Sequence, residues 1–229
     1  MTEQKLDRTF EDSRSAAENA KARQRLIEAA LRVFAEKGYD RTLSRDIAAV
    51  AGVSPAAINY YFGGKEGLYK AVYGEAHKGL VTLGQIEAIL NAGKSPSESL
   101  RDLIQLLIRS LLSTTNCKCY LQLVTREMTA PTPALDAYIQ EEFRPKIEGM
   151  RKIVASAAGL PVGHPTVAAC TASVLAQCAF LFQNHRTLPV LFSDLALTPE
   201  CAEAIAEHIF DFSMAGIQAL ADKANKEKP

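Results

Sequence analysis

Apolar residues recur every three or four positions along most of the chain, which is the spacing of one face of an α-helix. The first clear stripe is Leu26, Ala30 and Phe34, and it predicts a helix over residues 17–37 that ends at Gly38. No segment alternates apolar and polar residues between hairpin signals, as a strand would. The pattern therefore predicts an all-α fold of about nine helices.

The stretch 43–62 predicts two short helices joined by one tight turn. The first carries an apolar residue at every fourth position and ends at Gly52, a residue that readily adopts the left-handed conformation of a helix C-terminus. The second opens at Ser54 and Pro55, because Ser is a favoured N-cap and Pro is tolerated in the first turn. This arrangement is a helix-turn-helix.

The second of these helices turns small and polar side chains outward if Ile58 and Phe62 pack on the first. Small side chains let a helix enter the major groove, Asn pairs with adenine, and Tyr hydroxyls reach phosphates. This face predicts a recognition helix for double-stranded DNA, with Ala56, Ala57 and Tyr60 outward and Asn59 and Tyr61 on its flanks. An ordinary αα-hairpin is the alternative, and it predicts charged residues on that face.

The remaining helices follow from apolar stripes and from Ser, His or Thr placed directly before Pro. They are expected at about 66–90, 96–111, 117–128, 131–158, 165–184 and 199–224, with a bend or interruption at Pro145. Three regions result: a disordered arm over residues 1–15, a helix-turn-helix domain over 16–73, and a ligand-binding and dimerisation domain over 74–229.

Charge is unevenly distributed along the chain. The whole sequence has a net charge of zero, yet residues 20–73 carry nine basic and five acidic side chains, a net charge of +4. The rest must therefore sum to −4. A basic patch on an otherwise acidic protein is the electrostatic pattern expected of a small DNA-reading domain.

The segment 165–184 is apolar nearly all round, so a helix there needs cover on both sides. The segment 199–224 offers an apolar stripe, formed by Ile205, Ile209, Phe212 and Ile217. Two such helices from each of two subunits would form the four-helix interface of a homodimer. Cover by helices of the same subunit is the alternative.

Other chemistry is sparsely indicated. The odd number of cysteines, five, and the lack of a signal peptide predict a reduced, cytoplasmic chain. The most apolar run, 167–182, is shorter than the roughly 20 residues that a bilayer needs. Cys117 and Cys119 lack the further ligands of a zinc site, so we expect no metal and no cofactor. No nucleophile elbow, phosphate loop or dinucleotide fingerprint is present, which argues against an enzyme.

Three polar residues, Arg126, Glu127 and Gln177, interrupt apolar helices and need partners there. One interpretation is internal pairing, with an ion pair and a satisfied core amide. The other is a pocket for a small molecule, because ligand sites are apolar cavities with a few placed polar groups. The pocket would be completed by Tyr120, Tyr138, Cys178, Phe180 and Leu181.

The run 29–73 resembles the DNA-binding domain of the TetR family of bacterial transcriptional regulators. The matching positions are Phe34, Gly38, Arg45, Ile47, Ala48, Gly52, Val53, Ser54, Tyr60, Phe62, Lys65, Glu66 and Leu68. The resemblance implies that Thr42 or Ser44 caps a helix and touches phosphate, that Arg45 meets a base, and that Ser54 and Lys65 also belong to the DNA-binding set. Two positions depart from the family pattern: Leu43 replaces a common Thr or Ser, and Asn59 replaces a common aromatic residue, which suggests an altered base preference.

Residues 95–195 resemble the C-terminal domain of the TetR branch that responds to cefoperazone and chloramphenicol. The resemblance lies in REMTAPTPALDAYIQEEFRP, in Gly159-Leu160-Pro161 and in the helix around Gln177. It implies control of membrane-transport or drug-tolerance genes. We therefore expect a homodimeric repressor that binds a palindromic operator and is released by a small-molecule inducer. A chromosome-organising protein without a ligand, and an all-α enzyme or carrier with a DNA-binding head, are the alternatives.

Overall fold

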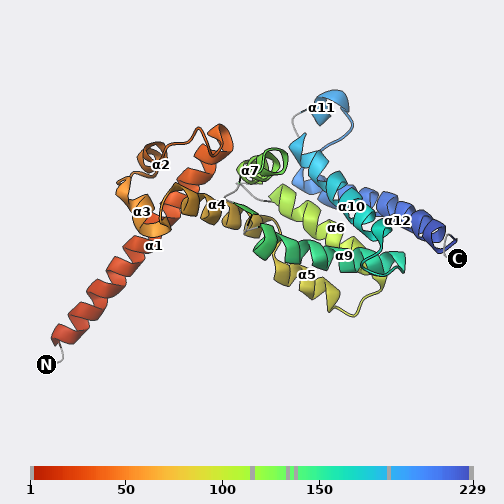
Figure 1. Ribbon diagram of the computed structural model, residues 1–229, viewed down its shortest axis with the longest axis horizontal. Coiled ribbons are helices and arrows are strands. Elements are labelled where there is room, and N and C mark those ends of the chain that lie inside the picture. Colours follow the sequence, from red (N-terminus) through yellow and green to blue (C-terminus); the bar gives the residue numbers. More distant parts are fainter. Residues whose placement is uncertain (1–2, 114–116, 133–134, 137–138, 185–186, 227–229) are drawn as a thin grey trace. The chain divides into compact units, whose positions relative to one another are not determined.

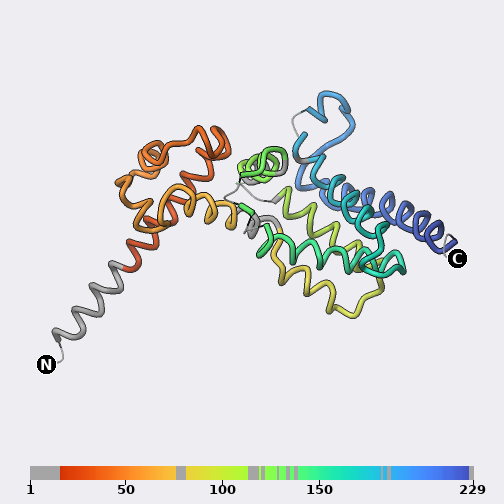
Figure 2. The backbone as a smooth tube through the Cα atoms, viewed as in Figure 1, coloured from red at the N-terminus to blue at the C-terminus, as the bar shows by residue number. Residues whose placement is uncertain are grey.

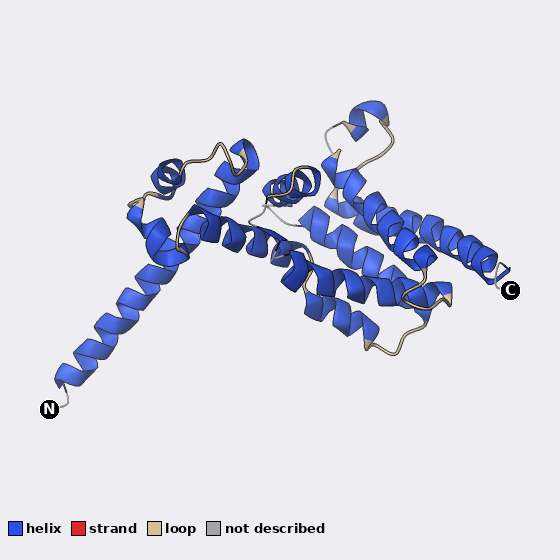
Figure 3. Ribbon diagram, viewed as in Figure 1, coloured by secondary structure: helices blue, strands red, loops and turns tan. Residues whose placement is uncertain are grey.

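The computed structural model describes residues 3–113, 117–132, 135–136, 139–184 and 187–226. It forms two compact units, each described here by itself. The first unit contains residues 1–75 and 122–135, and the second contains 76–121 and 136–229. Every regular element in the described residues is a helix (Figure 3). The predicted all-α fold is confirmed.

The first unit is built on α1 (Glu3–Lys37), α2 (Ser44–Ala51), α3 (Ala56–Phe62) and the start of α4 (Lys65–Leu80). Leu26, Ala30 and Phe34 of α1 are buried, as their spacing predicts. Helix α1 begins at Glu3, so the structure assigns helix rather than disorder to most of residues 1–15. The reason is that the sequence has neither Gly nor Pro before Gly38, and a missing apolar stripe argues against packing rather than against helix.

The chain turns between α2 and α3 at the residues that its sequence predicts, and Figure 2 shows the course of the backbone there. Gly52 adopts a left-handed conformation with φ of 63°, and its N–H bonds to carbonyl oxygens at the end of α2. Ser54 Oγ accepts a hydrogen bond of 3.3 Å from the N–H of Ala56. These two contacts end one helix and begin the next.

The second unit has one hydrophobic core among the described residues. Figure 1 shows the helices that contribute to it. Its helices are α5 (Leu83–Leu90), α6 (Pro96–Ser113), the start of α7 (Cys117–Thr129), α9 (Arg144–Ala158), α10 (Pro165–Gln183), α11 (Leu188–Leu191) and α12 (Ala202–Lys226). A π-helical turn at Ile139–Phe143 precedes α9, and a 3₁₀ turn at Pro199–Cys201 precedes α12. Helix α12 packs on α6, α9 and α10, while α5 packs on α9.

Two helix predictions need correction. The helix expected over 66–90 is two helices, because Thr82 and Gln85 form a capping box that starts α5. The short helix α11 also lies between the helices expected at 165–184 and 199–224. Among the described residues there are therefore eleven α-helices rather than about nine. The interruption expected near Pro145 is the π-helical turn, and Pro145 lies in the first turn of α9.

The segment 122–135 belongs to the first unit although the sequence places it deep inside the C-terminal region. The unit boundary in the chain lies between Glu75 and Ala76, close to the expected boundary after residue 73. Helix α7 is continuous across the second boundary, since its residues up to Leu121 belong to the second unit and those from Gln122 to the first.

The apolar stripe of α12 is part of the core of the second unit. Ile205, Ile209 and Ile217 are buried within the subunit, whereas the Phe212 side chain is 67% exposed. The prediction that this stripe forms a dimer interface is therefore wrong for the three isoleucines. An apolar stripe shows that a face is covered, but not whether the same chain or another one covers it.

Candidate nucleic-acid interface

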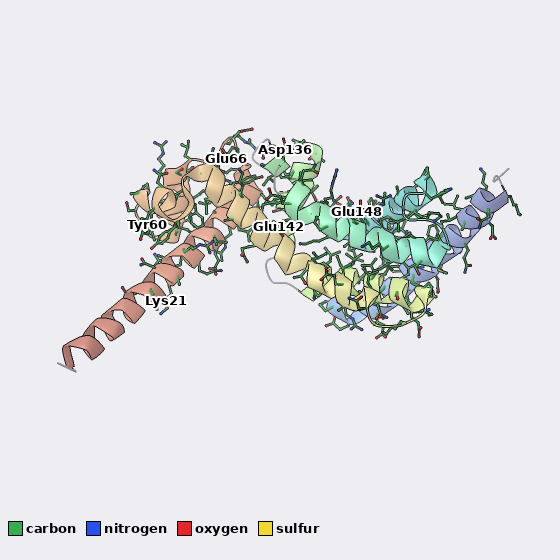
Figure 4. All side chains as sticks on the ribbon, turned by 60° about the horizontal axis from the view of Figure 1, so that its bottom comes forward. Lys21, Tyr60, Glu66, Asp136, Glu142 and Glu148 are labelled. Carbon is green, nitrogen blue, oxygen red and sulfur yellow. The ribbon has the colours of Figure 1, made fainter. Side chains whose placement is uncertain are left out.

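Helix α3 presents one face to its own unit and the other to solvent. Ile58 is almost fully buried, with 1% of its surface exposed. Ala56, Asn59 and Tyr60 are exposed, and Ala57 is partly exposed. Tyr60 is the most open of these, at 76%, and lies on the outside of the unit (Figure 4). The outward face is thus uncharged, unlike the solvated face of an ordinary surface helix.

Arg45 lies on the same unit, in the first turn of α2. Its side chain is 78% exposed, and its nearest acidic group is Asp46 at 4.0 Å. A contact of that length at the surface restrains a side chain very little. The Arg45 side chain is therefore exposed and only weakly restrained, and Asn59 of α3 is exposed as well.

Tyr61 has a partner on α1. Its hydroxyl donates to Asn19 Oδ1 at 2.8 Å, and Arg23 of the same helix stacks over the Phe62 ring at 5.3 Å. These contacts fix α3 against α1. The Tyr61 hydroxyl, expected at a phosphate, keeps only its acceptor lone pairs free in this arrangement.

Thr42 does not fit the predicted role. Its side chain is 0% exposed, and its hydroxyl donates to the carbonyl oxygen of Gly38 at 2.6 Å. A buried hydroxyl cannot reach a phosphate, so we remove Thr42 from the DNA-binding set. Ser44 is partly exposed at the first position of α2, and no side chain caps that helix at Leu43.

Lys65 is occupied inside the unit. Its Nζ donates to the carbonyl oxygens of Tyr39 at 3.0 Å and Thr42 at 3.1 Å, and it lies over the Tyr39 ring. An ammonium group has three protons, and two are used here. Lys65 therefore holds the 39–42 connection in front of α2, a role that the sequence did not indicate because its partners lie more than 20 residues away.

Arg25 of α1 is a second positioning residue that the sequence did not reveal. Its guanidinium donates to the carbonyl oxygen of Ala51, at 3.0 Å from Nε and 2.6 Å from Nη2, and to that of Gly52 at 2.7 Å. The last carbonyls of a helix have no partner within it, and a cation is favoured there. Arg25 thus ties α1 to the turn of the helix-turn-helix.

The residues predicted to line a ligand pocket divide between the two units. Gln177, Cys178, Phe180 and Leu181 belong to the second unit, whereas Arg126 and Glu127 belong to the first. Tyr138 lies outside the described residues, as does the side chain of Tyr120. The Gln177 amide donates to Ser213 Oγ at 3.0 Å, which is the satisfied core amide of the alternative interpretation. Burial raises the pKa of the Cys178 thiol to about 12.

Two further observations concern the described residues alone. No three His, Cys, Asp or Glu side chains gather there closely enough to hold a metal ion. None of the described helices is both long and apolar enough to cross a membrane.

Comparison with known families decides the identity of the helix-turn-helix. Residues 26–72 match the bacterial regulatory proteins of the tetR family, and residues 96–217 match the C-terminal domain of the HTH-type transcriptional dual regulator CecR. The chain belongs to the TetR family. It is a transcriptional regulator, and its relatives are regulators rather than enzymes.

Individual relatives agree with this TetR-family assignment. CecR of Shigella flexneri is 30% identical over 148 residues, which are 60% of this chain and 65% of CecR. The chain thus spans less than two thirds of CecR, and 49% and 42% of two other curated relatives.

Solved structures show the same fold. A tetR-family protein from Rhodococcus RHA1 has a TM-score of 0.66 at 22% identity, over 86% of this chain and 96% of that one. PfmR from Thermus thermophilus has a TM-score of 0.59 at 23% identity, over 81% of this chain and 97% of PfmR.

Proposed function

We propose that this TetR-family regulator is a homodimeric repressor that binds a palindromic DNA operator and leaves it when a small molecule occupies the second unit. The observation that carries the proposal is the outward face of α3, which is exposed and uncharged while Ile58 anchors the opposite face. Burial within the unit does not account for the exposed residues of this face, Ala56, Asn59 and Tyr60. This face suits the floor of a major groove, where close approach requires small side chains.

Two long polar side chains contact the base edges in this proposal, and three neighbouring residues of α3 assist them. Arg45 prefers the O6 and N7 atoms of guanine, and Asn59 prefers the N6 and N7 atoms of adenine. Ala56, Ala57 and Tyr60 surround them with methyl groups and one aromatic ring. Ser44 and Ser54 are the hydroxyls nearest the helix starts and serve the phosphate backbone, and Tyr61 joins them only if its hydroxyl turns its proton from Asn19 to a phosphate oxygen.

A second copy of the chain is the partner that α10 and α12 require. The outward face of α10 carries small and apolar residues: Ala168, Ala172, Ala176 and Phe180. On α12, Phe212 and Leu220 are exposed large apolar side chains. Two copies joined through these faces would cover them and form a four-helix interface. This placement uses the exposed residues Phe212 and Leu220 of α12 and not its buried isoleucines.

Dimer symmetry sets the form of the operator. Two copies of α3 related by a twofold axis read two half-sites about 34 Å apart, or a multiple of that distance. An inducer releases the DNA only through the difference between its affinities for the bound and released arrangements.

The inducer site lies in the second unit, and Gln177, Cys178, Phe180, Leu181, Tyr120 and Tyr138 remain its candidates. Arg126 and Glu127 leave this set because their side chains contact other residues of the first unit. The work of such a regulator requires access to the chromosome, so we place the protein in the cytoplasm.

Selection of bound duplexes from a random library tests the proposal. We expect an enriched palindrome, protected as one footprint by a protein that sediments as a dimer. The control is the Arg45→Ala/Asn59→Ala double variant, which should enrich no sequence while still binding DNA at low salt. Binding without any enriched sequence would favour the chromosome-organising alternative. A screen of small molecules, with chloramphenicol and cefoperazone among them, for release of the enriched duplex then tests induction.

A further inference from the structure

Helix α1 contacts the end of α3 through two side chains that lie one turn apart. Asn19 Oδ1 accepts a hydrogen bond of 2.8 Å from the Tyr61 hydroxyl, and the Arg23 guanidinium lies 5.3 Å from the centre of the Phe62 ring. Residues four apart on a helix share a face. One face of α1 therefore holds the last two residues of α3.

Asn19 and Arg23 belong to a stretch of α1 that precedes the core of the first unit. Among the described side chains of α1, Leu26 is the first that is buried, and Asn19 and Arg23 are exposed. The match to the tetR family also begins at residue 26. These two polar residues therefore contribute to the first unit through their contacts with α3 rather than through burial.

Tyr61 in turn contacts the most exposed residue of the outward face of α3. The ring centres of Tyr60 and Tyr61 are 4.8 Å apart, and the two rings meet edge to face at 80°. Aromatic pairs prefer this geometry. Tyr60 is itself 76% exposed. A Tyr61 ring that is fixed at its hydroxyl therefore also restricts the orientation of the Tyr60 ring.

The Asn19–Tyr61 hydrogen bond lies at the surface, so its strength depends on water. In the free protein, water competes for both partners and reduces the net value of such a bond. Entry of α3 into a major groove displaces water from the flank of the helix, and a hydrogen bond is stronger where water is excluded. The bond therefore favours the arrangement in which α3 is seated on DNA.

We propose that Asn19 is a positioning residue for sequence reading, because it holds Tyr61 and thereby keeps the Tyr60 ring in the orientation that the operator requires. The inference rests on the proposed function and adds to it a specificity-determining residue outside the helix-turn-helix. Tyr61 is then a support of the reading face and not a phosphate contact. Its loss matters where bases are read, since backbone contacts carry no sequence information.

Affinities for the selected operator and for a random duplex, measured at one fixed salt concentration, test this role. We call the quotient of the two affinities the specificity ratio. Asn19→Leu keeps the approximate shape of the side chain and removes the acceptor. We expect the specificity ratio to fall about fivefold, the factor that one hydrogen bond of ordinary net strength supplies. Tyr61→Phe removes the donor instead and should lower the ratio by the same factor.

Asn19→Asp is the rescuing variant. Its carboxylate oxygen still accepts the proton of Tyr61. Repulsion between the added charge and the phosphates acts on both duplexes alike, so we expect the specificity ratio of the wild type even where both affinities fall. The double variant Asn19→Leu/Tyr61→Phe should lose no more of the ratio than either single variant, because both changes remove the same bond.

Gln24→Leu is the matched control. Gln24 is another exposed amide residue of α1, but its Nε2 donates to Glu28 of the same helix at 3.1 Å. This variant should keep the specificity ratio of the wild type. Circular dichroism checks the folding of every variant, and Tyr61→Phe still tests the bond if Asn19→Leu does not fold.

The outcomes distinguish this inference from the proposed function. A wild-type specificity ratio near one would overturn the proposed function, because the protein would then read no sequence. A wild-type preference for the operator that survives in Asn19→Leu and in Tyr61→Phe would overturn the role of Asn19 alone, whether or not both affinities fall together. A ratio that falls in Asn19→Asp as far as in Asn19→Leu would overturn it too, since the acceptor oxygen would then have no effect.

Discussion

Lys65 Nζ lies 4.2 Å from the centre of the Tyr39 ring and also donates to the Tyr39 carbonyl oxygen. One cation thus holds both the ring and the backbone of a residue in the connection before α2. The family pattern points to this lysine as a DNA contact, whereas its geometry makes it a support for the neighbouring helix start.

Lys65→Ala should therefore lower the stability of the protein rather than the salt dependence of DNA binding. Loss of the donor leaves the carbonyl oxygens of Tyr39 and Thr42 without their partner, at a cost of about 1–3 kcal/mol in the free energy of unfolding. Urea denaturation measures it. The matched control is Lys70→Ala, whose surface pair with Glu66 is worth roughly 0.3–0.5 kcal/mol. An unchanged stability together with a salt slope smaller by about one unit would restore the phosphate role.

Arg45→Ala and Asn59→Ala should each weaken binding to the best operator by about 1–3 kcal/mol and to random duplexes much less, since only direct readout distinguishes the two. Affinities at one fixed salt concentration check this. Equal losses on both kinds of duplex would demote the two residues to backbone contacts and leave sequence reading to Ala56, Ala57 and Tyr60.

Phe212→Asp should produce a folded monomer, and Ile209→Asp an unfolded or aggregated chain. Both lie on α12, but Phe212 is exposed in the subunit and Ile209 is buried in its core. A charge buried without a partner costs several kcal/mol. At residue 212 this cost weakens association of the two subunits, and at residue 209 it weakens folding of the chain itself. Sedimentation and circular dichroism separate the outcomes. A Phe212→Asp protein that remains a dimer would move the interface elsewhere.

Cys178 should be nearly inert to iodoacetamide at pH 8 in the native protein. Only the thiolate reacts, and burial raises the pKa of this thiol to about 12. In the unfolded chain this thiol has an ordinary pKa of about 8.5, so it ionises there first as pH rises. Its contribution to the free energy of unfolding is therefore complete below about pH 8.5 and is lost as pH rises through 12. Cys178→Ala should remove part of this decline. Native-state labelling as fast as that of the unfolded protein would show that the thiol is accessible.

Local signals in the sequence predicted local structure well. Gly52, Ser54 and Pro55 defined the helix-turn-helix turn, because helix ends depend on the residues at those ends. The capping box at Thr82 and Gln85 is an equally local signal, although the apolar stripe alone predicts one helix over 66–90. The same pattern is present at Ser95 and Glu98, at the start of α6.

The contacts that the sequence did not predict are those between residues far apart in the chain. Nothing near Arg25 indicates that Ala51 is its acceptor, and nothing near Glu127 indicates that the Tyr69 hydroxyl donates to it. Polarity at Glu127 correctly indicated a need for partners, but the partner was a structural hydroxyl rather than a ligand. The dimer interface predicted from the isoleucine stripe of α12 was wrong for a related reason. The sequence of one helix does not show whether the same chain or another one covers its apolar face.

The position of Gly38 predicts which substitutions in the first unit will abolish DNA binding and which second mutation will restore it. Its backbone has φ of +79°, and the Arg126 guanidinium occupies the space where a side chain would begin. A screen for loss of DNA binding should return substitutions at residue 38 often. Shortening of Arg126 would act as a second-site suppressor of Gly38→Asn better than of Gly38→Val. Removing the collision leaves only the backbone conformation, which Asn tolerates and a β-branched residue does not.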